Sequence, residues 1–455
     1  MRGDRTDTSR QETQPGAPLR RRDVLGGSAA LLAGSIAGSL STGLTGTGAR
    51  AATFSADKAV AIEYWIGVGV DSSKAYQAIL ADFRHAHPNV NVKLNNYSEY
   101  EPLNTALQAA IAGRKPPALA EVGFDLIRYT ATFLPHIGVE DAARAAGEDG
   151  STFLSENFSQ KILALGQVGG VQHLLPQLTG SPYLFYNQDA FARAGIERPP
   201  ATWPDLRECA RRITVKTGRP CFSIPEKGYF WAYQALIESN GALLLTQDGN
   251  RYGTQLGDPA AIEAMQLMAD MVLRDKTALY LGDAQAGADY QNGDLPMITG
   301  FSSQVVGAVK AGRFKVGTAP LPGWPGKPKR IPVAGSGFMF FDVGEAERGA
   351  AWTLAKFMCE PAAQTMFTKG TGYPPTRLGV ADNPTYLGSF YKDNPLFGPD
   401  IAQLDSVVPW ISFPGQNGPQ ASKVLDETRD RIFAGQDVAS VLQSSAKQIS
   451  EMINT

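Results

Sequence analysis

The residues that could carry covalent chemistry do not form an enzyme motif in this sequence. Residues 300–304 (GFSSQ) lack the closing glycine of the G-x-S-x-G turn that exposes a serine nucleophile. Residues 335–337 (GSG) have glycines without the required spacing. No glycine-rich loop ends in Gly-Lys-Ser or Gly-Lys-Thr, the phosphate-binding signature. Nucleophilic catalysis and nucleotide hydrolysis therefore have no support, and we expect no catalytic residues.

The histidines do not predict a metal site. His85 and His87 stand two residues apart near the expected end of a helix, whereas His136 and His173 are remote, so a zinc site would need distant partners. Solvated histidines are the simpler interpretation, and we expect no metal and no cofactor. Paired carboxylates for glycoside hydrolysis stay open, because 44 acidic residues always offer pairs.

Length and composition indicate a globular protein of two domains. The 455 residues exceed what one hydrophobic core usually organises, and 43% of them are apolar. The net charge of -2, without a basic stripe, argues against nucleic acid or an anionic membrane as a partner. No apolar run after the N-terminal region reaches the roughly 18 residues of a membrane span.

The N-terminal segment is typical of an export signal. Three arginines (20–22) precede a weakly apolar, glycine-rich run to about Leu44, and residues 49–51 (ARA) supply a cleavage site. The arginines, followed by Asp-Val-Leu, resemble a twin-arginine signal; a disordered tail is the alternative. No cysteine follows the run, so lipid attachment is not expected. We expect residues 1–51 to be removed and the mature protein to be soluble in the periplasm.

Three cysteines leave at least one thiol free or paired with another molecule. Cys209 lies on the apolar side of an expected helix, which favours a buried structural thiol. A bond from Cys209 to Cys221, across a helix-to-strand turn, is the alternative.

Hydrophobic periodicity predicts alternating strands and helices. Residues 59–65 form an apolar run of strand length, a helix begins at Asp71, and residues 90–94 alternate as a strand. This strand-helix-strand unit predicts parallel pairing, and a second α/β region follows, with a helix capped by Thr202. Such alternation predicts open sheets covered by helices on both faces. Further strands are expected within 117–122, 165–175 (a hairpin), 294–303 and 331–342.

Several short motifs occur in the order found in one family. Residues 181–206 (SPYLFYNQDAFARAGIERPPATWPDL) join a strand end, an acidic helix start and a Thr-Trp-Pro-Asp helix entry. This segment contains the motif 186–191 (YNQDAF), and four further motifs accompany it: 64–65 (YW), 100–101 (YE), 292–294 (NGD) and 371–375 (TGYPP). In this combination the chain resembles family 1 of the extracellular solute-binding proteins of ABC importers, closest to the branch that binds glycerol 3-phosphate, glycerophosphodiesters and sugars.

The resemblance implies a two-lobed periplasmic-binding-protein fold of the α/β class. Each lobe would contain an open sheet flanked by helices, with the ligand cleft between the lobes. The expected boundaries are 57–180 with 335–372 for lobe 1, and 182–332 with 375–455 for lobe 2, with hinge strands near 181–187 and 333–340.

The resemblance also implies ligand contacts. The family's ligand-binding tyrosines and crossover glycine match Tyr100, Tyr373 and Gly335, although these residues could instead serve the surface, a helix cap and a chain bend. Trp231, with Tyr229 and Phe230 beside it, lies in the region where the family has a tryptophan that stacks on the ligand. A position in the hydrophobic core is the alternative. The complete predicted set is Trp65, Tyr100, Asp125, Ser181, Trp231, Ser302, Gly335 and Tyr373.

One departure from the family concerns the ligand. The relatives have an arginine after a Pro-Gln to hold phosphate, whereas here Pro419-Gln420 is followed by Ala421 and Ser422. Loss of a charge-assisted bidentate contact removes about 1.5 to 3 kcal/mol. We therefore favour a neutral sugar or polyol over a phosphorylated ligand.

The expected partners are this solute and the transmembrane subunits of an ABC permease, with the protein itself a monomer. The alternatives are an exported glycoside hydrolase and a binding protein that signals to a membrane receptor.

Overall fold

The computed structural model describes residues 58–225 and 230–454, with two large sheets and two small hairpins. The predicted export signal and Tyr229 lie outside the described residues. Among the helices of the described ranges, none is both long and apolar enough to cross a bilayer.

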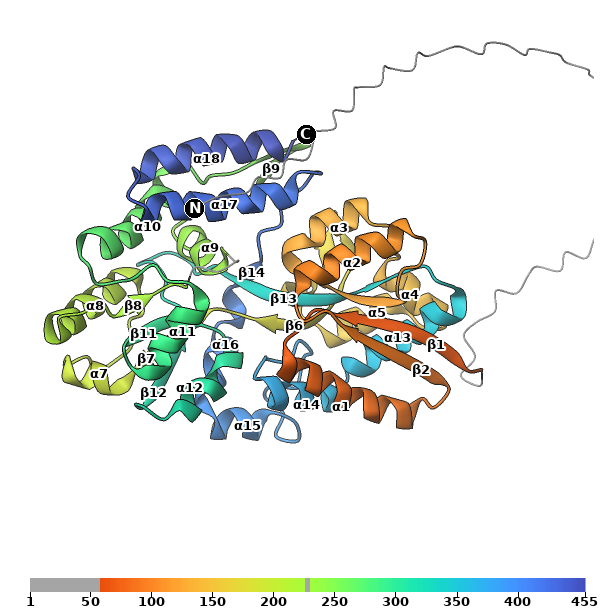
Figure 1. Ribbon diagram of the computed structural model, residues 1–455. Coiled ribbons are helices and arrows are strands. Elements are labelled where there is room, and N and C mark those ends of the chain that lie inside the picture. Colours follow the sequence, from red (N-terminus) through yellow and green to blue (C-terminus); the bar gives the residue numbers. More distant parts are fainter. Residues whose placement is uncertain (1–57, 226–229, 455) are drawn as a thin grey trace, which may run out of the picture. The chain divides into compact units, whose positions relative to one another are not determined.

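The first sheet has six strands and contains the longest strand of the chain, β13, which crosses the middle of Figure 1. Its strands are β1 (Val60–Ile66), β2 (Val90–Asn96), β3 (Leu119–Gly123), β6 (Leu175–Gly180), β13 (Ile331–Phe340) and β14 (Val407–Pro409). The path runs β14-β13-β3-β1-β2, and β6 also pairs with β13. β1 is parallel to β2, as predicted, whereas β13 is antiparallel to β3 and β6.

The second sheet has four strands in the order β12-β7-β11-β8, with β7 antiparallel to both of its neighbours. Its strands are β7 (Tyr183–Asn187), β8 (Phe222–Ser223), β11 (Met297–Gly300) and β12 (Val316–Pro320). The hairpin predicted at 165–175 is present as β4 (Gln167–Val168) and β5 (Val171–Gln172). A second hairpin pairs β9 (Thr246–Asp248) with β10 (Arg251–Gly253).

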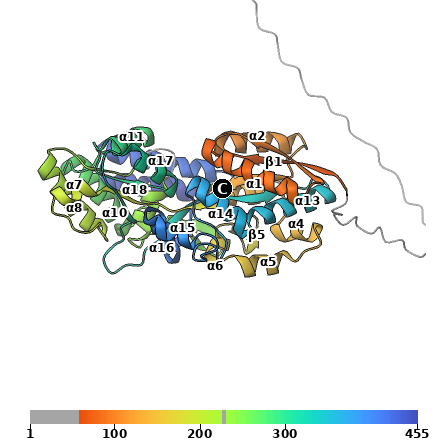
Figure 2. The ribbon, with the colours of Figure 1, turned by 90° about the horizontal axis from the view of Figure 1, so that it is seen from below.

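Helices cover both sheets, and α1 packs against α14 in the view from below (Figure 2). The helices up to residue 269 are α1 (Val70–Ala86), α2 (Tyr100–Ala112), α3 (Ile127–Phe133), α4 (Val139–Ala145), α5 (Gly150–Asn157), α6 (Gln160–Ala164), α7 (Gln188–Arg193), α8 (Trp203–Thr217), α9 (Trp231–Glu238) and α10 (Pro259–Ala269).

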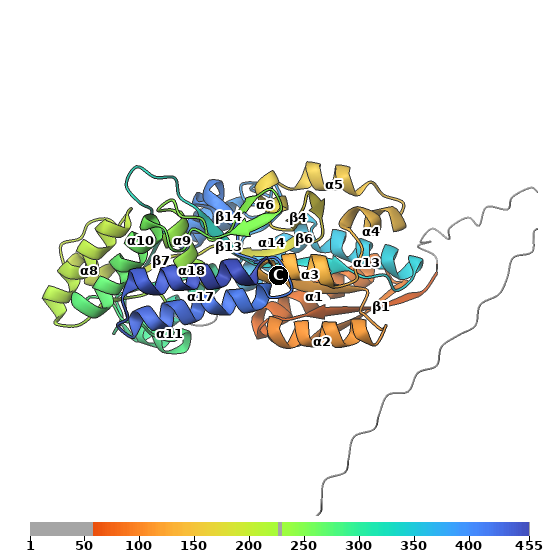
Figure 3. The same cartoon turned by 90° about the horizontal axis from the view of Figure 1, so that it is seen from above.

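The helices after residue 269 include α17 and α18, which lie side by side in Figure 3 and pack against each other. They are α11 (Asp283–Asn292), α12 (Val305–Ala311), α13 (Glu345–Met358), α14 (Pro361–Thr371), α15 (Gly388–Asp393), α16 (Gly398–Ala402), α17 (Gly418–Phe433) and α18 (Val438–Met452).

Local sequence explains where these elements begin and which face they bury. In α1, the apolar stripe of Tyr76, Ile79, Leu80 and Phe83 is almost completely buried. The Thr202 side chain accepts a hydrogen bond from the Asp205 N–H, which caps α8 as predicted. These apolar stripes are what hold the helices to the sheets.

Several features differ from the sequence-based expectation, among them strands β9, β10 and β12, which were not predicted. Residues 183–187, expected as a hinge strand, form β7 inside the second sheet, so the chain passes between the sheets at Ser181 and Pro182. The strand expected within 294–303 is only four residues long, because a 3-10 turn starts at Ser302. β14 was not predicted, since three residues are too few for a periodic pattern.

The three cysteines are buried free thiols, so Cys209 and Cys221 are not bonded. Burial raises the pKa of Cys221 to about 12, which keeps this thiol protonated and unreactive at neutral pH.

Candidate functional site

A cavity of about 250 Å³ lies where strands of the first sheet meet helices and loops of the second region. We call it the aromatic cavity. Its lining comes from at least six separate stretches of chain: Gly67, Val68, Gly69, Ser72, Ser98, Glu99, Tyr100, Leu178, Gly180, Trp231, Phe301, Ala334, Gly335, Tyr373 and Trp410. Contributions from such distant segments make it a site that only the completed fold creates.

The backbone along one side of the cavity depends on Gly335 in β13. This residue has a φ of +133°, and a Cβ placed on it would lie 2.0 Å from the Leu178 carbonyl oxygen of β6. Only glycine tolerates both the conformation and this approach. The register pairs Gly335 with Thr179 and Ala334 with Gly180. β6 and β13 therefore stay paired as far as Gly180, where β6 ends.

Aromatic side chains form the walls. The rings of Trp231 and Phe301 have centroids 4.1 Å apart, and both line the cavity with Tyr373 and Trp410. On the opposite side, the Tyr100 hydroxyl donates to Ser336 Oγ at 3.0 Å, which orients the tyrosine along β13. Flat aromatic faces with a few hydroxyl groups suit the stacking and hydrogen bonding of a hydroxylated solute.

A fully buried carboxyl group, Glu121 in β3, lies behind the cavity. Its Oε1 is hydrogen-bonded to the Tyr76 hydroxyl and, at 3.4 Å, to the Tyr64 hydroxyl, while Oε2 accepts the Gly67 N–H at 3.5 Å. Gly67 itself lines the cavity, so Glu121 is one backbone group away from the ligand space. Burial is the larger effect and raises the pKa of Glu121 to about 7, whereas these hydrogen bonds act in the opposite direction.

Proton counting supports a protonated Glu121. The Tyr76 hydroxyl also lies 2.7 Å from Gln177 Oε1, yet it has a single proton to share between two acceptors. Either Glu121 carries a proton and donates it to Tyr76, or the Gln177 amide turns its nitrogen toward the tyrosine. The first solution agrees with the direction in which burial moves the pKa.

Four of the eight predicted ligand-binding residues line the aromatic cavity: Tyr100, Trp231, Gly335 and Tyr373. Trp65 does not; it is half-buried on the other face of β1, tilted against Tyr97, and its Nε1 donates to Glu63 at 2.8 Å. Asp125 follows β3, close to Gly123, and burial raises the pKa of Asp125 to about 6. Burial is the main cause of the raised pKa of Tyr100, and Asp125 adds a small contribution, but Asp125 is not among the lining residues.

Ser181 and Ser302 are buried beneath the cavity, next to Asp400 of α16. Sequence reasoning did not identify Asp400, because nothing in the local sequence marks one acidic residue among 44 as buried. Burial is the larger effect and raises the pKa of Asp400 to about 6, whereas Ser181 and Ser302 act in the opposite direction. The same reasoning also missed Phe301 and Trp410, whose only sequence signal is an aromatic residue beside a strand end.

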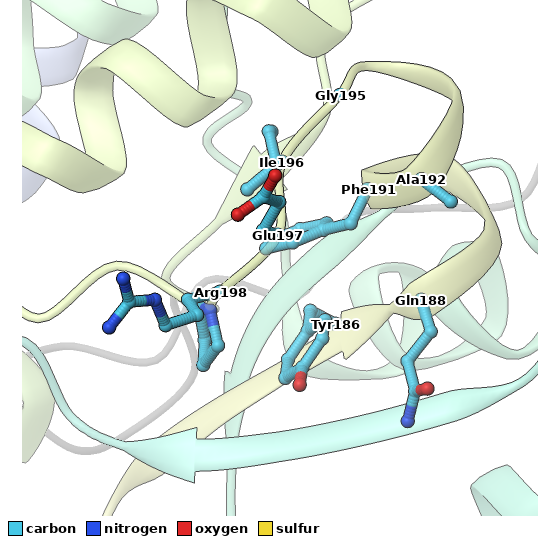
Figure 4. Close-up of a pocket in the computed structure, with 9 residues that line it drawn as sticks. Tyr186, Gln188, Phe191, Ala192, Gly195, Ile196, Glu197 and Arg198 are labelled. Atoms are coloured by element: carbon cyan, nitrogen blue, oxygen red, sulfur yellow. The ribbon is translucent and has the colours of Figure 1, made fainter.

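A second depression, of about 420 Å³, lies where β7 continues into α7 (Figure 4). Tyr186 and Gln188 point toward β12, where the Gln188 amide donates to the Val316 carbonyl oxygen at 2.8 Å. Glu197 and Arg198 complete one side. All of its lining comes from residues 186–199, and no predicted ligand-binding residue contributes. The aromatic cavity is therefore the better candidate for the functional site.

Metal-ligating side chains do not cluster in the described ranges, where no group of three or more His, Cys, Asp or Glu residues could hold an ion. The nearest arrangement is a pair: His136 Nε2 lies 2.8 Å from His173 Nδ1, at hydrogen-bond distance.

Comparison with known proteins places this geometry in a family. Residues 78–399 match the bacterial extracellular solute-binding proteins. The sn-glycerol-3-phosphate-binding periplasmic protein UgpB of Brucella abortus (strain 2308) is 25% identical over 431 residues, covering 88% of this chain and 95% of the relative. UgpB of Rhizobium meliloti (strain 1021) is 24% identical over 401 residues, covering 85% and 92%.

Solved structures share the fold. UgpB from Mycobacterium tuberculosis in complex with glycerophosphocholine superposes with a TM-score of 0.76 at 20% identity, over 87% of this chain and 99% of the other. The cyclic alpha-maltosyl-1,6-maltose binding protein from Arthrobacter globiformis gives 0.73 at 20% identity, over 87% and 99%. The predicted two-lobed α/β fold is thus confirmed, and the chain belongs to the bacterial extracellular solute-binding protein family.

Proposed function

We propose that this protein captures a neutral sugar or polyol in the aromatic cavity and delivers it to the membrane permease of an ABC importer. The observation that carries the proposal is the lining: five aromatic residues, several backbone segments at glycines, and no lysine or arginine among the lining residues of the described ranges. A hydroxylated neutral solute is what such a surface binds best.

Hydrogen-bonding groups are available for the hydroxyls of such a solute. Ser72 and Ser98 line the cavity together with Tyr100 and Tyr373. A phosphate, in contrast, would find no lysine or arginine among the described lining residues, and Ala421 and Ser422 stand where the resemblance leads us to expect the phosphate-holding arginine. The missing charge-assisted contact is worth about 1.5 to 3 kcal/mol, or more than tenfold in affinity.

Binding would act by closing the two lobes. We assign residues 57–180 with 335–372 to lobe 1 and 182–332 with 375–455 to lobe 2, which places Tyr100 and Trp231 on opposite lobes. A ligand that contacts both residues stabilises the closed state over the open one. The closed monomer would then dock on the transmembrane subunits of the permease.

A glycerophosphodiester with a quaternary ammonium group is the second candidate. Two carboxyl groups, Asp125 and Asp400, lie close enough to the lining residues Tyr100 and Tyr373 to act on them, and with pKa values raised by burial to about 6 both are ionised at neutral pH. Aromatic faces near negative charge favour a cation. The binding of glycerophosphocholine by the Mycobacterium tuberculosis relative is in line with this alternative.

Isothermal titration calorimetry separates the two candidates. The mature protein would be titrated with maltose, glycerol, glycerophosphocholine and glycerol 3-phosphate. We expect saturable binding of a neutral solute and none of glycerol 3-phosphate. Trp231→Ala and Tyr373→Ala should each weaken binding about tenfold or more. Phe133→Ala, an exposed aromatic outside the cavity, is the matched control and should bind like the wild type. Preference for glycerol 3-phosphate over every neutral solute would refute the proposal.

The remaining alternatives have their own assays. An exported glycoside hydrolase would release the chromophore from a nitrophenyl glycoside, and the binding protein proposed here would not. A sensory binding protein would dock on a receptor, so uptake of the labelled solute should survive deletion of its gene. We further propose export with removal of residues 1–51 and no lipid attachment, which N-terminal sequencing of the periplasmic protein would test.

A further inference from the structure

Asp400 is 2% exposed and is hydrogen-bonded to Ser181, the residue after Gly180 of the cavity lining, which we call part of the cavity floor. Its Oδ1 accepts hydrogen bonds from the Ser181 N–H, at 3.0 Å, and from the Ser181 hydroxyl. Gln403 also holds residues 181–182, since its amide nitrogen donates to Ser181 Oγ at 2.7 Å and to the Pro182 carbonyl oxygen at 2.8 Å. Residues near α16 therefore hold the point where the chain passes between the sheets.

A second arm runs from Asp400 to Ser302. The Ser302 hydroxyl is close enough to lower the pKa of Asp400, although the two groups do not meet hydrogen-bond geometry. Ser302 is completely buried and starts the turn after β11. One carboxyl group is thus hydrogen-bonded to the loop at Ser181 and lies beside the loop at Ser302, about 120 residues further along the sequence.

Each of these serines directly follows a residue of the cavity floor. Gly180 precedes Ser181, Phe301 precedes Ser302, and both Gly180 and Phe301 line the cavity. The packing between them is tight: a Cβ on Gly180 would lie 3.1 Å from the Tyr373 ring and 3.5 Å from the Phe301 ring. A small movement of either loop would therefore shift the rings on which a ligand rests.

We propose that Asp400 is a positioning residue for ligand binding, which ties the loops at Ser181 and Ser302 together and thereby sets the placement of Gly180, Phe301 and Tyr373. This inference rests on the proposed role of the aromatic cavity as the ligand site. It changes the role of the two predicted serines, which hold the floor from below instead of touching the solute.

The role needs the shape and the acceptor of Asp400, not its charge. Among the described residues, Oδ2 has no hydrogen-bond partner and no lysine, arginine or histidine forms an ion pair with this carboxyl group. The titratable groups that face it are the hydroxyls of Tyr183, Tyr373 and Tyr391. Asparagine has nearly the same shape and keeps an oxygen that can accept hydrogen bonds from the Ser181 N–H and hydroxyl, so it should replace aspartate.

The test compares Asp400→Ala with Asp400→Asn. For maltose, or whichever neutral solute of the panel binds, we expect the alanine variant to raise Kd about tenfold or more and the asparagine variant to stay within about threefold. Ser181→Ala and Ser302→Ala remove one arm each and should fall between. Asp437→Asn, at the exposed cap of α18, removes the same charge far from the site and is the control. If Asp400→Ala does not fold, the two serine variants decide.

A ligand-free readout keeps this test separate from the proposed function. Trp231 packs on Phe301, so its fluorescence and its quenching by acrylamide report the position of the floor. Asp400→Ala should change both, Asp400→Asn should not, and the change should disappear in a Trp231→Phe background. Unchanged emission and unchanged Kd in Asp400→Ala would overturn the inference, as would equal impairment of the asparagine and alanine variants. Failure of every solute to bind the wild type would refute only the proposed function.

Discussion

The acidic residues around the aromatic cavity and those beside Arg207 have opposite environments. Glu121, Asp125 and Asp400 are held by hydroxyl and backbone N–H groups, without an ion pair among the described residues, and burial raises the pKa of each. Asp275 is hydrogen-bonded to Arg207 at 2.7 Å. Burial acts to raise its pKa too, but the arginines beside it lower it overall.

The direction of the pKa shift shows which carboxyl groups stabilise the fold in their ionised form. A group whose folded-state pKa is raised binds its proton more tightly in the native state, so the free energy of unfolding falls as the pH rises from the unfolded to the folded pKa. A group whose pKa is lowered behaves in the opposite way. The cavity thus stores an electrostatic cost at neutral pH, whereas the arginine cluster contributes stability there. Such a cost at a ligand site is a common signature of function.

The largest effect should come from Glu121→Gln. With a folded pKa of about 7 against 4.5 unfolded, the wild type should lose about 3 kcal/mol of unfolding free energy between pH 4.5 and 8, at roughly 1.36 kcal/mol per pKa unit. The amide has no proton to lose and keeps the contacts to Tyr76 and Gly67. Urea denaturation across this pH range should therefore show a flatter profile for the variant. Glu101→Gln, exposed on α2, is the control, and an equally steep profile in Glu121→Gln would contradict the assignment.

Asp125→Asn should flatten the pH dependence of the unfolding free energy in the same direction as Glu121→Gln, but by a smaller amount. Its folded pKa of about 6 against 3.8 predicts a loss of about 2 kcal/mol in the wild type between pH 4 and 7, reduced from the full value by partial exposure. Burial is the main cause of the raised pKa of the lining residue Tyr100, and Asp125 adds only a small contribution, so the variant also tests whether the charge of Asp125 affects the ligand. Denaturation profiles give the first result and calorimetry gives the second. Identical profiles for variant and wild type would remove Asp125 from the group of cavity acids.

The fold could be predicted further from the sequence than the site, for a physical reason. Periodicity is local, so the strand and helix of 60–86 and the cap at Thr202 follow from a few neighbouring residues. β14 pairs with β13 only because the chain returns from residue 407 to 331, which no short window contains. The burial of Asp400 is likewise a property of the assembled fold.

The site divides in the same way. The tyrosines at 100 and 373 and Gly335 were predicted from motifs in a recurring order, and all three line the cavity. Ser181 and Ser302 were predicted from the same order, yet they lie one residue beyond the lining positions and point to Asp400. Both serines lie just past a strand end, where the chain turns, so neighbouring side chains point in different directions and an error of one position replaces a lining residue with a buried one. Motif order therefore locates the loops, and only the structure identifies the side chains that face the cavity.

Arg207→Ala should show the opposite pH dependence of the unfolding free energy, with its largest effect at neutral pH. It removes a side chain that is 31% exposed and forms ion pairs with Asp275 at 2.6 Å and Asp270 at 3.5 Å. We expect a loss of about 1 kcal/mol at pH 7, since partly buried pairs exceed exposed ones only modestly. The loss should shrink as the pH falls below 3.8 and Asp275 takes up its proton. Urea denaturation at pH 7 and pH 3 measures this, and a loss that is unchanged in acid would show that packing, not charge, is responsible.

Arg211→Ala should have the smallest effect, although Arg211 lies one turn from Arg207 on the same helix. Its contact with Glu208, at 2.8 Å, is within 0.2 Å of the 2.6 Å contact between Arg207 and Asp275, but the two side chains are 61% and 54% exposed. Water and salt screen this pair, and fixing two long side chains costs the entropy that the attraction returns. We expect no resolvable change in the urea midpoint at pH 7, with or without added salt. Because the two arginines share a helix and an alanine replacement, equal losses would mean that side-chain packing on α8, and not the exposure of the ion pair, separates the two acidic environments.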